Sequence, residues 1–246
     1  MPITRRELLT AAVGGGALAA TGAFAQPPAA QPPGHVVLLG DSMFDNQMFV
    51  GQGKPVVDNL REALPAGWKA TLLAAVSQTA REVAVQLRQL PKGATHLVLC
   101  AGGNNAILGL FNLFQQAAPQ ALLARLQQDR ADFERDYAAL VKQMLAKKLH
   151  AVLCTIPDPD FTHPNLRNLQ LIGQLGLPLF NDVISRTAAK EQLPLLDLRV
   201  LVQGKPDHAP GDGVHLSPAG GRKVAGQIVK IVEQHDFAKK QSIIYS

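Results

Sequence analysis

The chain has few of the residues that metal centres, disulfide-rich scaffolds and nucleic-acid surfaces require. Its 246 residues include two cysteines, one tryptophan and two tyrosines, and aromatic residues make up 5% of the total. Two cysteines cannot complete a four-ligand zinc site alone, and no H-E-x-x-H run assists them. The lysines and arginines are scattered among few aromatic residues. We therefore expect no metal, no cofactor and no nucleic-acid partner.

The two cysteines, Cys100 and Cys154, each lie near the end of an apolar run typical of a strand. Small buried core residues are one interpretation. A disulfide bond is the other, because an oxidising compartment permits it if the two strands are neighbours in register.

The N-terminal segment has the pattern of an export signal. Residues 4–9 carry a twin arginine followed by leucines, and an uncharged Ala/Gly-rich stretch leads to Ala23-Phe24-Ala25, an A-x-A cleavage site. We predict a twin-arginine-type signal peptide over residues 1–25. An uncleaved transmembrane helix is the alternative, which four glycines between residues 14 and 22 disfavour.

A Pro/Ala-rich linker is predicted over residues 26–34, and a single domain over residues 35–246. The signal predicts recognition by the export machinery and a periplasmic or secreted protein. No other segment is apolar enough to span a membrane, so we expect no stable membrane insertion after cleavage.

Apolar runs alternate with helical patterns along the predicted domain. Strands are expected at residues 35–39, 68–74, 95–100, 151–155 and 193–198, and helices at residues 56–63, 80–90, 120–147, 179–191 and 218–233. This alternation predicts an α/β fold, a three-layer α/β/α sandwich around a five-stranded parallel sheet.

Chemically useful side chains fall at one edge of this sheet. Ser42 follows the first strand, Asn104 follows the third, and His215 precedes the last helix. Sites in open parallel sheets form beyond the carboxyl ends of the strands. Asp212 lies three residues before His215, so both side chains can approach one spot on a turn. A hydroxyl, an imidazole and a carboxylate are the groups of a serine hydrolase.

Three runs in the same places resemble the signature blocks of the SGNH hydrolases, also called the GDSL esterase/lipase family. They are Gly40 to Asn46, Gly102 to Asn105 and Asp212 to His215, and they span most of the predicted domain. The resemblance implies the flavodoxin-like SGNH hydrolase fold. It implies that Ser42 is the nucleophile, that His215 is its base, and that Asp212 orients the imidazole.

The resemblance also implies an oxyanion hole made by the Ser42 main-chain N–H, the Asn104 amide and a glycine N–H from another block. The corresponding run, residues 75–80, has no glycine. We assign its donor to Gln78. Asn105, where many relatives carry aspartate, is expected to support the loop.

These observations predict an exported esterase that cleaves small-molecule carboxylic esters through an acyl-serine intermediate. Residues 107–114 form a Leu/Phe-rich insertion that either packs on itself or covers an acyl pocket, which would favour short or medium acyl chains. Acetylated sugars and lipid esters are both open as substrates.

Two other functions stay open. The missing glycine is compatible with a catalytically silent binding protein on the same fold. A flavodoxin-like cofactor binder would use Gly40-Asp41-Ser42 to hold phosphate. No Ser/Thr/Gly-rich phosphate loop follows the first strand, however, and Asp45 adds negative charge there.

Overall fold

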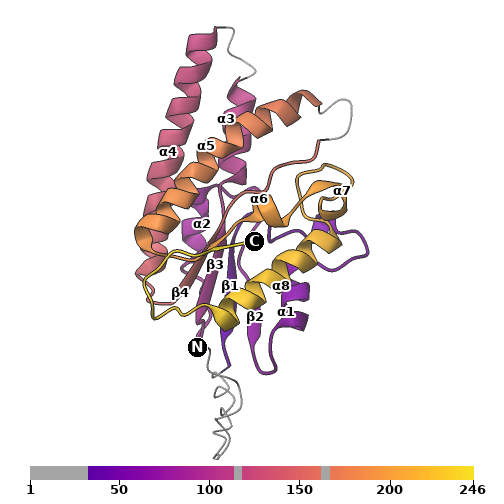
Figure 1. Ribbon diagram of the computed structural model, residues 1–246, viewed down its shortest axis with the longest axis vertical. Coiled ribbons are helices and arrows are strands. Elements are labelled where there is room, and N and C mark those ends of the chain that lie inside the picture. Colours follow the sequence, from indigo (N-terminus) through magenta and orange to yellow (C-terminus); the bar gives the residue numbers. More distant parts are fainter. Residues whose placement is uncertain (1–32, 114–117, 162–166) are drawn as a thin grey trace, which may run out of the picture. The chain divides into compact units, whose positions relative to one another are not determined.

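Within residues 33–113, 118–161 and 167–246, which the computed structural model describes, six parallel strands form one sheet (Figure 1). Their order is β2-β1-β3-β4-β5-β6, and every neighbouring pair runs parallel. The strands are β1 (His35–Gly40), β2 (Lys69–Leu72), β3 (His96–Cys100), β4 (His150–Cys154), β5 (Leu195–Leu196) and β6 (Ile244–Tyr245).

Helices cover both faces of the sheet, and the predicted three-layer α/β/α class is confirmed. The long helices are α1 (Val56–Ala63), α2 (Ala80–Gln86), α3 (Gly103–Leu113), α4 (Pro119–Leu145), α5 (Arg167–Glu191) and α8 (Pro218–Gln234). The short ones are the 3-10 helix η1 (Gln47–Phe49), α6 (Leu198–Leu201) and α7 (Gly204–Asp207). Helices α1 and α8 pack together on one face, and α2, α4 and α5 cover the other (Figure 1).

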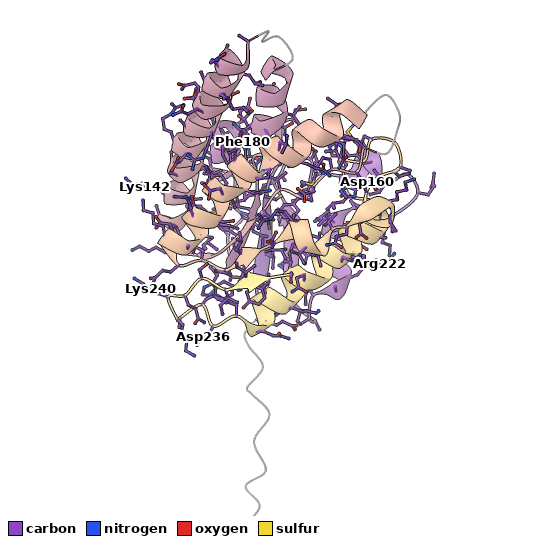
Figure 2. The ribbon with its side chains drawn as sticks, turned by 45° about the horizontal axis from the view of Figure 1, so that its top comes forward. Lys142, Asp160, Phe180, Arg222, Asp236 and Lys240 are labelled. Atoms are coloured by element: carbon purple, nitrogen blue, oxygen red, sulfur yellow. The ribbon has the colours of Figure 1, made fainter. Side chains whose placement is uncertain are left out.

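The apolar runs are continuous because both faces of the sheet are buried. In β1, Val36 and Leu38 face the α1/α8 core, while Val37 and Leu39 face the opposite core. Phe180 of α5 lies inside the second core, whereas Lys142 lies at the margin of the molecule (Figure 2). Alternate side chains of β1 therefore pack into the two cores, so that the carboxyl end of this strand is fixed between the two helical layers.

Four predictions about the elements need correction. The sheet has six strands rather than five, because the two residues of β6 pair with β5. The strand predicted at 193–198 shrinks to Leu195–Leu196. The insertion at 107–114 is helical through Leu113, as part of α3. The helix predicted from 179 already begins at Arg167 and contains Pro178, whose missing N–H and ring disfavour a helix interior.

Residues 162–166 lie outside the described part of the chain, as do the predicted signal peptide and most of the predicted linker. In the described residues, no helix combines the length and hydrophobicity that crossing a membrane requires.

The two cysteines lie on neighbouring strands, since Leu99 of β3 pairs with Leu153 of β4 and a cysteine follows each. Both are buried and free. A hydrogen bond with Cys154, together with burial, raises the pKa of the Cys100 thiol well above its usual value. Both side chains pack in the core, as the first interpretation expects.

Candidate active site

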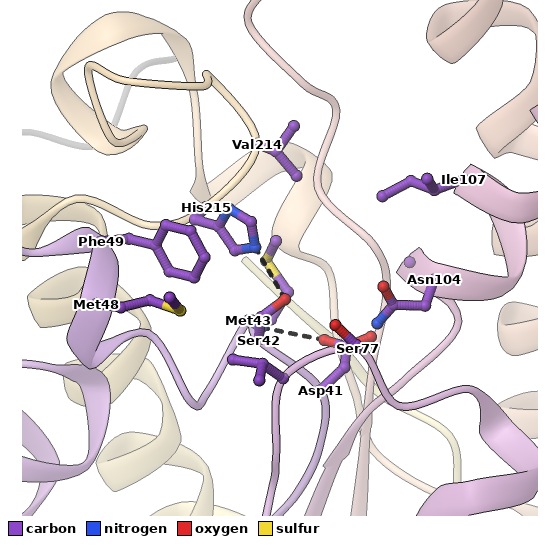
Figure 3. A pocket seen from close by; sticks show the side chains of 12 residues that line it. Asp41, Ser42, Met43, Met48, Phe49, Ser77, Asn104, Ile107, Val214 and His215 are labelled. Atoms are coloured by element: carbon purple, nitrogen blue, oxygen red, sulfur yellow. Dashed lines mark hydrogen bonds between the residues drawn. The ribbon is translucent and has the colours of Figure 1, made fainter. Parts of the chain in front are cut away.

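The nucleophile turn begins where β1 meets β3. A Cβ at Gly40 would lie 1.7 Å from the Cys100 carbonyl oxygen, so only glycine fits this close approach. The Asp41 N–H donates to that same oxygen, at 3.2 Å. The chain then turns, with the N–H groups of Phe44 and Asp45 donating to the Asp41 carbonyl. Ser42 is left at the carboxyl edge of the sheet, with its hydroxyl facing the pocket (Figure 3).

Asp41 stabilises this turn. Its Oδ1 accepts the Met43 N–H at 3.0 Å, which closes an Asx turn around Ser42. Its Oδ2 is buried and has no hydrogen-bond partner among the described residues. Burial raises the pKa of Asp41 to about 6, against the lowering effects of the Met43 N–H and of His215.

The three residues predicted to form the triad lie in a hydrogen-bonded row. Figure 3 shows the Ser42–His215 part of this row. His215 Nε2 is 2.9 Å from Ser42 Oγ, and His215 Nδ1 is 2.7 Å from Asp212 Oδ2. An ionised carboxylate only accepts, so Nδ1 carries the proton and Nε2 accepts from the Ser42 hydroxyl. This tautomer is the one in which the imidazole can remove the serine proton.

The Asp212 carboxylate is held in its charged form. Burial alone would raise the pKa of Asp212, but the hydrogen bonds from the His215 ring and from the N–H groups of Val214 and His215 outweigh burial and lower the pKa to about 2. Asp212 is therefore ionised at neutral pH and can stabilise a protonated imidazole.

The structure places Ser77 rather than Gln78 at the pocket wall. Ser77 has φ of 62°, a left-handed conformation that favours glycine, and it lies in the run where the resemblance implies a glycine. Gln78 contacts the site through its carbonyl, which accepts from Asn104 Nδ2 at 3.0 Å. Ser77 is therefore the better candidate for the donor that we had assigned to Gln78.

Three donors remain available at this wall. Among the described residues, the N–H groups of Ser42 and Ser77 have no acceptor. Asn104, near the start of α3, uses one amide hydrogen on Gln78 and keeps a second. Asn105 Oδ1 accepts the Ala80 N–H at 2.9 Å, so this neighbour supports the turn, as expected.

The pocket beside Ser42 has a volume of about 340 Å³. Its polar lining comes from Asp41, Ser42, Ser77, Gly103, Asn104 and His215, and its apolar lining from Met43, Met48, Phe49, Val76, Ile107 and Val214. Within the described residues it has no lysine or arginine, and no group of three or more metal-ligating side chains occurs.

Two residues near the site had no signal in the sequence. Phe49 stacks on the His215 ring, with the ring centroids 3.4 Å apart. Gln86 of α2 is buried and binds both main-chain groups of Gly40, accepting its N–H at 2.9 Å and donating to its carbonyl at 2.8 Å. A single phenylalanine and a helical glutamine are compatible with many structural roles. The roles of Phe49 and Gln86 are therefore visible only in the folded structure.

A serine, an imidazole and a carboxylate aligned beyond a parallel sheet have the geometry of a serine hydrolase site. Comparison with known families agrees, because residues 38–223 match the GDSL-like lipase/acylhydrolase family. The chain belongs to this family of carboxylic ester hydrolases. A search of curated proteins found no match.

Solved structures share the fold at low sequence identity. An extracellular lipase from Streptomyces rimosus has 16% identity and a TM-score of 0.58, and an aryl esterase from M. smegmatis has 15% and 0.59. Est24, a carbohydrate acetylesterase from Sinorhizobium meliloti, has 11% and 0.58. Each match covers 81% of this chain and 98% of the other.

Proposed function

We propose that the protein is an exported esterase that hydrolyses uncharged carboxylic esters through an acyl-serine intermediate. The observation that carries this proposal is the row of hydrogen bonds from Ser42 Oγ through His215 to Asp212, at 2.9 and 2.7 Å. Such a row turns a weak hydroxyl nucleophile into a reactive one, because the base is already within reach of the proton.

In the first half of the reaction, Ser42 Oγ attacks the ester carbonyl carbon as its proton passes to His215 Nε2. Asp212 stabilises the resulting imidazolium. When the tetrahedral intermediate collapses, His215 gives this proton to the departing alcohol oxygen and the ester C–O bond breaks. In the second half, His215 takes a proton from water, whose oxygen attacks the acyl-serine, and Ser42 leaves with the proton.

The oxyanion of each tetrahedral intermediate would be bound by the N–H groups of Ser42 and Ser77 and by the free amide hydrogen of Asn104. Loss of one such donor costs about 100- to 1000-fold in rate. The left-handed φ of Ser77 supports an active site over a silent one, because the position retains a glycine-like backbone without the glycine.

Short or medium acyl chains fit the pocket best. A volume of about 340 Å³ lies near the lower end for ligand sites, about 300 to 1,000 Å³. Six of its twelve lining residues are apolar, and none of the lining residues is a lysine or an arginine. Acetylated sugars and small lipid esters both satisfy these limits. The predicted signal at residues 1–25 would place the reaction in the periplasm or outside the cell.

A chain-length series of nitrophenyl esters tests the proposal. The wild type should release nitrophenol fastest from acetate or butyrate and more slowly from long chains, and Ser42→Ala should release none above background. Purified protein that turns over no ester at any length would contradict the proposal.

A further inference from the structure

The imidazole of His215 has a second partner besides its hydrogen-bonded neighbours. The phenyl ring of Phe49 lies parallel to it, with 3.4 Å between ring centroids and 5° between ring planes (Figure 3). Phe49 is the last residue of η1, the short helix that follows the nucleophile turn. One whole face of the imidazole is therefore covered at van der Waals distance.

The same segment also holds the main chain next to His215. The buried side chain of Asn46 donates to the Leu216 carbonyl at 3.2 Å and accepts the Val56 N–H at 2.9 Å. Asn46 thus ties the base-bearing loop to the start of α1, while Phe49 contacts the ring itself. Two independent contacts connect the segment after Ser42 to the base.

The imidazole needs such support because its hydrogen bonds change during the reaction. Once Ser42 Oγ carries the acyl group, it no longer donates a proton to Nε2. The Nδ1 bond to Asp212 then remains, and that carboxylate is itself one-third exposed, at 34%. A ring held at one atom can swing, whereas a ring packed flat against a phenyl group cannot rotate without a clash.

We propose that Phe49 is a positioning residue for His215, keeping imidazole Nε2 aimed at the oxygen atoms that exchange protons with it during acylation and deacylation. The proposal rests on the proposed esterase function. The competing role is a pocket wall, since Phe49 also lines the pocket. If Phe49 is only a pocket wall, its substitution should change the rate according to the acyl length of the substrate. If Phe49 supports the base, its substitution should lower the rate equally for all substrates.

The experiment compares Phe49→Leu, Phe49→Tyr and Phe237→Leu with the wild type on acetate, butyrate and octanoate esters. Phe237 is a matched control, because its ring also packs against a histidine, with 4.5 Å between its centroid and that of His150. His150 is the first residue of β4 and therefore lies at the opposite edge of the sheet. Phe49→Leu should lower kcat by about 10- to 100-fold for all three esters, the range expected for a misplaced catalytic group. The KM of Phe49→Leu should change little. Phe49→Tyr keeps an aromatic ring and should retain the wild-type kcat, and Phe237→Leu should have the kcat and KM of the wild type.

A loss confined to KM or to long acyl chains would overturn the proposal, as would an unchanged kcat in Phe49→Leu. The ring contact is also tested without turnover, by the NMR shifts of the His215 ring protons. They should move downfield in Phe49→Leu and stay in place in Phe237→Leu, because only the first loses the ring current. Ring-proton shifts that are the same in Phe49→Leu and in the wild type would refute the stacking. If these shifts differ but the wild type turns over no ester, only the esterase function is refuted.

Discussion

The main-chain N–H of Asp160 donates to the Gly213 carbonyl at 2.7 Å, which joins the loop after β4 to the loop that carries Asp212 and His215. The approach is so close that a Cβ at Gly213 would lie 2.1 Å from the Asp160 carbonyl oxygen. Gly213 also has φ of 65°, in the left-handed region. The residue that directly follows the acid must therefore be glycine.

We expect Gly213→Ala to displace the base and to lower kcat/KM by about 100-fold, since a shift of about 1 Å costs that much. Steady-state kinetics on a nitrophenyl ester measures the effect. Gly211→Ala is the matched control, because a Cβ at Gly211 meets nothing within 4 Å. Equal losses in the two variants, or none in Gly213→Ala, would show that the contact does not position the loop.

Asp41 makes the stability of the protein depend on pH. Its pKa is about 6 in the folded protein, against 3.8 for an ordinary aspartate, because the side chain is buried. The folded state therefore holds the proton more tightly than the unfolded state. The stability gained from this protonation is fully present below about pH 4 and is lost as the pH rises through about 6.

The Asp41→Asn variant keeps the side-chain shape and cannot titrate, so it isolates this effect. The difference between 3.8 and about 6 corresponds to about 3 kcal/mol. Relative to Asp41→Asn, the wild type should lose about that much free energy of unfolding between about pH 4 and 7. Urea unfolding of both proteins across this range is the measurement. Parallel pH profiles would mean that folding does not raise the pKa of Asp41.

Most of the fold could be predicted because burial on both faces makes each parallel strand a continuous apolar run. Val36 to Leu39 is an example, with alternate residues in the two cores. The edge strand Ile244–Tyr245 has no such pattern, because Ile244 is exposed and two residues suffice to pair with β5. The start of α5 was missed because Pro178 lies inside the helix.

The candidate site shows a similar limit. The sequence supplied Ser42, Asp212 and His215 and the sheet edge where they meet, because side-chain type and strand end can both be read from the pattern. The sequence pointed to Gln78 as the third oxyanion donor. The positive φ that favours Ser77 instead belongs to a turn that is hydrogen-bonded by Asn104 and Asn105. Backbone conformation fixed by distant side chains has no local pattern.

Ser77→Gly should raise the free energy of unfolding by about 0.5–1 kcal/mol. A left-handed φ costs a residue with a Cβ about 1–2 kcal/mol, which exceeds the entropy that glycine loses on folding. Chemical denaturation is the measurement. Gln78→Gly serves as the comparison, because its φ is not positive, and it should lower stability by about 0.5–1 kcal/mol. A lower stability for Ser77→Gly as well would argue against strain at this position.

Gln86→Leu should lower the free energy of unfolding by about 1–3 kcal/mol, because the Gly40 N–H is then left unpaired in the core. The Gly40 carbonyl keeps a second partner, the Ala75 N–H, at 3.2 Å. Gln89→Leu, an exposed change three residues further along the chain, provides the control. If both variants unfold at the wild-type denaturant concentration, the amide of Gln86 does not hold the strand end.

Covalent labelling shows directly whether the imidazole of His215 activates the hydroxyl of Ser42. Purified wild type is incubated with a fluorophosphonate, and the modified peptide is located by mass spectrometry. We expect one adduct, on Ser42, that is absent in Ser42→Ala and forms at least about 1000-fold more slowly in His215→Ala. A wild type that stays unlabelled, or that labels equally fast without His215, would contradict this expectation.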